Sequence, residues 1–139
     1  MENQLGWTTI EQSEKLIEAG LDLDTADMWY DMLDKCTLYP KINEFYLHDF
    51  YYLDREYPCW SLGRLIELMP EIAVLARDST GNIPSYFMSI MPSESGEDIF
   101  MSEQYSTPIE AAVSTIIWLF ENNYIKKGET KRLNLNRNQ

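Results

Sequence analysis

Cys59 and His48 are the residues of this chain whose types could form a nucleophile and its general base. A histidine that accepts the proton of a cysteine thiol activates the sulfur, and Asp49 or Asp54 could orient the ring. However, Cys59 stands between a proline and a tryptophan, where a small apolar filler of the core is the ordinary role of cysteine. The sequence therefore predicts a structural cysteine and no catalytic residue.

The same side chains are too few and too scattered for a metal site. A structural zinc site needs four ligands, and the soft candidates are Cys36, Cys59 and His48. A chain with 23 acidic residues forms carboxylate pairs such as Asp22 with Asp24 by chance, and it contains no EF-hand pattern of alternating acids. The six glycines are too far apart for a phosphate-binding loop. We expect neither a metal nor a cofactor.

The most distinctive stretch, residues 57–70, reads YPCWSLGRLIELMP and predicts a short amphipathic helix between two prolines. Ser61 can cap this helix, its apolar residues fall on one face, and Pro70 marks its end. The simplest interpretation is a core element. The alternative is a hydrophobic patch that offers Trp60 to a partner as an anchor.

A second candidate binding region is rich in aromatic residues. Residues 39–57 hold seven aromatic side chains without a helical or strand period, so we expect irregular or partly stranded structure. Tyr46, Tyr51 and Tyr52 lie beside a histidine and aspartates, a composition typical of binding surfaces. With Trp60, they are the candidate partner-binding residues.

The charge of the chain restricts its partners. The net charge is −12 at pH 7, and residues 1–110 carry 21 acids and six bases, whereas residues 111–139 carry two acids and five bases. An acidic body repels phosphate backbones and anionic lipids, so we expect no nucleic acid or membrane partner for it. A basic protein is the partner that charge favours, and a purely solubilising role for the acids is the alternative.

The sequence also predicts a cytoplasmic location. No basic segment followed by an apolar run opens the chain, and the longest apolar run, residues 111–120, is short for a membrane span. We therefore expect both cysteines to be reduced. For the oligomeric state we expect a monomer or a homodimer.

Two segments in the first quarter carry helical signals. Thr8 and Glu11 have capping-box spacing ahead of a helix over residues 9–19, and Gly20 fits its C-terminal end. Residues 24–36 are ambiguous, because their apolar residues match a helix face while their aromatic content also suits an extended segment. Periodicity favours the helix there.

The last helix has the clearest start. Thr107 is placed to cap it, Pro108 stands at its first position and Glu110 at its third, so we expect a helix over residues 108–123. Its most apolar stripe should be buried against a sheet and consists of Val113, Ile116, Ile117 and Phe120.

Strand patterns fill the region between the helices. Residues 72–77 and 84–91 flank a Gly-Asn loop and predict a hairpin, and residues 98–105 predict a third strand. The expected fold is α+β: a small antiparallel sheet of three or four strands, packed by a C-terminal helix, with two shorter helices. We expect one globular domain over residues 1–128 and a polar, flexible tail over residues 129–139.

Four segments carry a resemblance to a known family: residues 7–16, 19–28, 58–70 and 107–125. The chain resembles a family of small uncharacterised proteins that are encoded in prophages and conjugative elements of anaerobic gut bacteria. The resemblance implies a mobile-element context and brings no functional residues with it.

These observations favour a cytoplasmic accessory protein of a phage or mobile element that acts by protein-protein binding and is not an enzyme. One alternative is an acidic inhibitor of a basic nucleic-acid enzyme, either an immunity protein or a DNA mimic, which requires a continuous surface of carboxylates. A weaker alternative is the small cysteine-dependent hydrolase, which requires a pocket holding Cys59 and His48 within hydrogen-bond reach.

Overall fold

Three α-helices and two small antiparallel sheets form the part of the chain that the computed structural model describes, residues 6–31, 41–42, 56–70, 72–91 and 100–126. The helices are α1 (Ile10–Ala19), α2 (Leu62–Glu67) and α3 (Pro108–Glu121), with a short 3-10 turn η1 (Leu23–Thr25). The strands are β1 (Met28–Asp31), β2 (Lys41–Ile42), β3 (Glu56–Cys59), β4 (Ile72–Asp78), β5 (Ser85–Met91) and β6 (Phe100–Met101). The two sheets have the strand orders β2-β1-β3 and β4-β5-β6, and the α+β class is confirmed.

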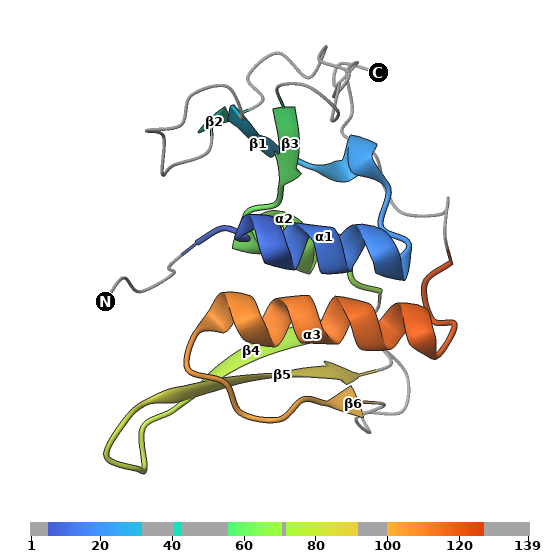
Figure 1. Cartoon of the computed structure of the whole chain (residues 1–139). Helices are drawn as coiled ribbons and strands as arrows, with labels where there is room; N and C mark the ends of the chain where they lie inside the picture. Colours follow the sequence, from blue (N-terminus) through green and yellow to red (C-terminus); the bar gives the residue numbers. More distant parts are fainter. Residues whose placement is uncertain (1–5, 32–40, 43–55, 71, 92–99, 127–139) are drawn as a thin grey trace, which may run out of the picture.

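Helix α3 lies at the centre of the fold. It runs between the sheet β4-β5-β6 on one side and α1 and α2 on the other (Figure 1), and it contacts β5, α1 and α2. Ile116 and Leu119 of α3 are fully buried. Helix α1 in turn contacts β3 of the other sheet, β2-β1-β3. The C-terminal helix therefore packs on a sheet, as the sequence predicts, and it also joins that sheet to the rest of the fold.

The start of α3 matches the sequence signals. The Thr107 side chain accepts a hydrogen bond from the Glu110 backbone N–H, and Pro108 occupies the first turn, where its missing N–H costs nothing. The helix ends at Glu121, two residues earlier than expected, and Asn123 then adopts a positive φ of 64°. Asparagine tolerates this left-handed conformation better than most residues do.

Helix α1 begins one residue later than the expected capping box. Thr9, not Thr8, is the N-cap, and its partner in the box is Gln12. The Thr8 hydroxyl faces the core instead, where it accepts the backbone N–H of Trp60 at 3.1 Å. Gly20 ends the helix with φ 125°, as its position predicted.

The helix favoured for residues 24–36 is wrong where the structure describes this segment. Residues 28–31 form strand β1, which pairs with both β2 and β3. Tyr30 lies opposite Tyr57 in this ladder, and its hydroxyl donates to the Thr8 carbonyl oxygen at 2.7 Å. Cross-strand aromatic pairing thus outweighs the helical period of the apolar residues.

The predicted hairpin is confirmed. Strands β4 and β5 pair along their full length, from Ile72 opposite Met91 to Asp78 opposite Ser85. Within the described part of the third expected strand, residues 100–105, β6 covers two residues, and one further bridge joins Tyr105 to Tyr86. The expected tail, residues 129–139, lies outside the described residues.

Candidate functional site

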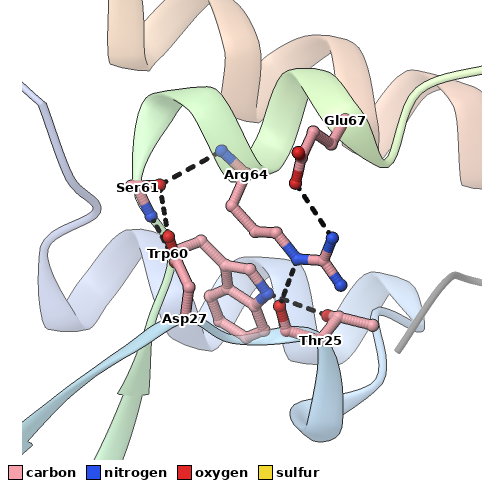
Figure 2. Close-up of polar contacts among 6 residues, drawn as sticks. All are labelled: Thr25, Asp27, Trp60, Ser61, Arg64 and Glu67. Carbon is pink, nitrogen blue, oxygen red and sulfur yellow. Dashed lines mark hydrogen bonds and ion pairs between the residues drawn. The ribbon is translucent and has the colours of Figure 1, made fainter. Parts of the chain in front are cut away.

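The distinctive 57–70 motif builds a polar network that holds α2 in place. The Asp27 carboxylate accepts two hydrogen bonds from Ser61, from its backbone N–H at 2.9 Å and from its hydroxyl at 2.5 Å (Figure 2). The Ser61 oxygen accepts the Arg64 backbone N–H at 3.1 Å, which caps the helix as the sequence predicted. Because Asp27 directly precedes β1, these bonds fasten α2 to the sheet β2-β1-β3.

Trp60 and Arg64 extend this network into the core, and both reach Thr25. The Trp60 indole N–H donates to the Thr25 hydroxyl at 2.9 Å, and the Arg64 Nε–H donates to the Thr25 carbonyl at 2.8 Å. Arg64 also forms an ion pair with Glu67 at 3.0 Å. The Trp60 side chain is 0 % exposed, so its interpretation as a core residue is correct. A surface anchor needs an exposed ring, and Trp60 does not provide one.

Cys59 is a core residue as well. It is 0 % exposed, and its thiol lies 3.4 Å from the Thr8 carbonyl oxygen. Burial raises the pKa of the Cys59 thiol to about 12, because desolvation penalises the thiolate. His48 lies outside the described residues. The surroundings of Cys59 thus oppose thiolate chemistry at neutral pH.

We expect Cys59 to react very slowly with thiol reagents in the folded protein. In a Cys36→Ser variant Cys59 is the single thiol, and iodoacetamide at neutral pH should label it at least about a hundredfold more slowly than in urea, since a buried thiol is protonated and shielded. Mass spectrometry of timed samples measures this ratio. Equal rates in the two conditions would contradict the buried, neutral thiol.

The other residues considered for a site either lie outside the described part of the chain or form no metal centre within it. Tyr46, Tyr51 and Tyr52 lie outside the described residues. Among the residues that the structure describes, no three His, Cys, Asp or Glu side chains gather closely enough to hold a metal ion. None of the helices in the same ranges has the length and apolar character needed to cross a membrane.

The feature that stands out is a single open stripe on α3. Most of this helix is buried on its two packed faces, but Ser114, Ile117, Trp118 and Glu121 are only partly covered or exposed. Their spacing of three, four and seven residues places them on one side of the helix. Ile117, expected to be buried, belongs to this stripe, because α1 and β6 leave a gap there.

Two hollows meet along this stripe, and together we call them the α3 groove. The β6 hollow, about 440 Å³, lies between β6 and α3, and its lining includes Phe100, Met101, Glu103, Ile117, Trp118 and Glu121. The α1 hollow, about 490 Å³, lies between α1 and α3, and its lining is Lys15, Glu18, Ala19, Ile117, Phe120 and Glu121. Because Ile117 and Glu121 line both, the two hollows adjoin across α3. Figure 1 shows α3 with α1 above it and β6 below it.

Two rings that line the β6 hollow, Phe100 and Trp118, belong to a stack of three aromatic rings whose third member is Tyr124. The Phe100 and Trp118 ring centroids are 4.3 Å apart, and those of Trp118 and Tyr124 are 5.4 Å apart, with interplanar angles of 28° and 16°. Such stacking adds stability beyond the buried area and restrains each ring. The hollow therefore has a preformed aromatic wall.

The charge of the α3 groove is negative. Among the described residues that line it, three carboxylates, Glu18, Glu103 and Glu121, accompany one amine, Lys15. This part of the groove contains no thiol or imidazole. Its chemistry is that of a recognition surface for apolar and cationic side chains.

The sequence did not indicate this groove. The stripe on α3 carries Ile117 and Trp118. Because the whole helix is apolar, its sequence predicts that both are core residues. The available signal was Glu121, which shares a helix face with Ser114 and Ile117. Comparisons with known proteins add no further guide: no family model, curated protein or solved structure gives a significant match to the chain.

Proposed function

We propose that the chain is a cytoplasmic accessory protein that acts by binding a basic protein through the α3 groove. The observation that carries this proposal is the open stripe on α3, where Ile117 and Trp118 lie at the surface beside Glu121. Partly exposed apolar and aromatic side chains next to charged ones are typical of protein interfaces. The mobile-element context of the chain is part of the proposal and rests on the resemblance of its sequence segments.

The composition of the α3 groove suits the binding of a protein better than the imitation of DNA. A surface that imitates DNA needs closely spaced carboxylates with little apolar area between them, whereas the α3 groove is lined by apolar and aromatic side chains as well as by Glu18, Glu103 and Glu121. The apolar part can contribute affinity by leaving water. The carboxylates can speed the encounter with a basic partner and exclude acidic ones.

Affinity capture with two charge-matched variants tests the proposal. The groove variant combines Glu103→Gln with Glu121→Gln, and the control combines Glu11→Gln with Glu14→Gln on α1. All four residues are exposed, so each variant removes two surface charges. Immobilised wild-type protein and both variants are incubated with lysate from cells that naturally encode the chain, and bound proteins are quantified by mass spectrometry.

We expect a protein rich in lysine and arginine to bind the wild type and the control equally, and to bind the groove variant about fivefold or more weakly. Two lost surface ion pairs, at up to about 1 kcal/mol each, correspond to a reduction of this size. Equal retention by all three proteins would contradict a role of the α3 groove in binding.

A further inference from the structure

We propose that the β6 hollow is a binding site for the side chain of an arginine on the partner. This inference rests on the proposed function, because it names the group that the acidic end of the groove recognises. The hollow combines the two features that bind a guanidinium group, an aromatic wall and nearby carboxylates. Phe100 and Trp118 supply the wall, and Glu103 and Glu121 supply the carboxylates.

The placement of these groups on different elements makes the hollow a built site. Glu121 and Trp118 come from α3, whereas Phe100 comes from β6 and Glu103 follows that strand. The stack of Phe100, Trp118 and Tyr124 fixes the orientation of the wall. The packing of β6 and α3 therefore brings two carboxylates and an aromatic surface to the same hollow.

Arginine fits this arrangement better than lysine does. Its guanidinium group is planar, so it can lie flat against Phe100, the end ring of the stack that lines the hollow, while its N–H groups point sideways to carboxylates. Trp118, the middle ring, supports Phe100 from behind. It is also more weakly hydrated than an ammonium group, which lowers the cost of leaving water. The lysine ammonium is compact and strongly hydrated, and it cannot stack.

The size and charge of the hollow agree with such a ligand. Its volume of about 440 Å³ can hold one long side chain with part of the peptide that carries it. Lys15, the amine that lines the groove, belongs to the α1 hollow and not to the β6 hollow. The net charge of −12 of the whole chain further favours a basic segment at this site.

The test is a titration followed by NMR. The ¹⁵N-labelled full chain is titrated with the acetylated, amidated tripeptide Gly-Arg-Gly and, in parallel, with the corresponding Gly-Lys-Gly. The reporter is the indole N–H signal of Trp118, assigned through its loss in a Trp118→Phe variant. Glu121→Gln removes one carboxylate of the hollow, and Glu11→Gln on α1, which lines neither hollow, is the matched control.

We expect weak, saturable binding of the arginine peptide with shifts of the Trp118 signal. Its dissociation constant should be at least about threefold smaller than that of the lysine peptide, since a guanidinium group gains from stacking on the ring. Glu121→Gln should weaken arginine binding by a similar factor, about threefold, and Glu11→Gln should leave it unchanged. Absence of Trp118 shifts, equal binding of both peptides, or no effect of Glu121→Gln would each overturn the arginine site.

These outcomes are separate from those of the capture experiment. If the groove variant loses its protein partner while the arginine peptide fails to bind, the groove binds by another contact and only the arginine site is wrong. If capture does not depend on the groove, the proposed function itself is wrong, whatever the peptides do.

Discussion

Replacing Trp60 by alanine should lower the free energy of unfolding by about 3 to 5 kcal/mol, the usual range for a fully buried large aromatic residue. The Trp60 ring is 0 % exposed, and its indole N–H bonds to the Thr25 hydroxyl at 2.9 Å. The substitution therefore leaves a large cavity and removes the hydrogen bond that joins the residue after β3 to η1. Since domains of this size have a total stability of about 5 to 15 kcal/mol, the variant should be close to unfolding.

Trp118→Ala is the matched control for this prediction. Trp118 is only partly buried and stacks on Phe100 and Tyr124 at the surface. Its removal should cost less than that of Trp60, because the partly exposed ring buries less area and leaves no closed cavity, and its two stacking contacts contribute about 0.5 to 1.5 kcal/mol each. Urea unfolding followed by circular dichroism measures both values. A Trp60→Ala variant as stable as Trp118→Ala would contradict the central position of Trp60.

Alanine substitutions of the two adjacent isoleucines on α3 should lower the free energy of unfolding by different amounts. Ile116→Ala is expected to cost about 2 to 5 kcal/mol, since Ile116 is fully buried in the core. Ile117→Ala should cost less than half as much, because Ile117 lines the groove and is partly exposed. Thermal and urea unfolding of the two variants measures the difference. Equal losses at both positions would mean that the groove is closed over Ile117.

Signals that lie close together in the chain predicted their structures well. Thr107 with Pro108 marked the start of α3, Gly20 marked the end of α1, and Ser61 capped α2. Each of these features depends on contacts within one turn, so the local sequence contains the necessary information. The β4-β5 hairpin is similar, because its two strands follow each other across a short loop.

Features that depend on distant partners were missed. Strand β1 resembled a helix because the apolar spacing of residues 28–33 fits both periods. Its pairing partner β3 lies 25 to 31 residues further along the chain, from Asp31 opposite Glu56 to Met28 opposite Cys59. The burial of Arg64 depends on the Thr25 carbonyl, which the sequence does not place nearby. The α3 groove is formed together with residues of α1 and β6 that flank the Ile117 stripe, and no pattern within α3 alone reveals that.

Site-specific photo-crosslinking tests most directly whether the α3 groove binds a basic protein. A photoreactive amino acid replaces Ile117 in the groove or Ile83, which is 76 % exposed in the loop between β4 and β5, and each variant is irradiated in cells that naturally encode the chain. We predict that position 117 crosslinks to one lysine- and arginine-rich protein and that position 83 does not. No crosslink from position 117, or the same products from both positions, would contradict binding through the groove.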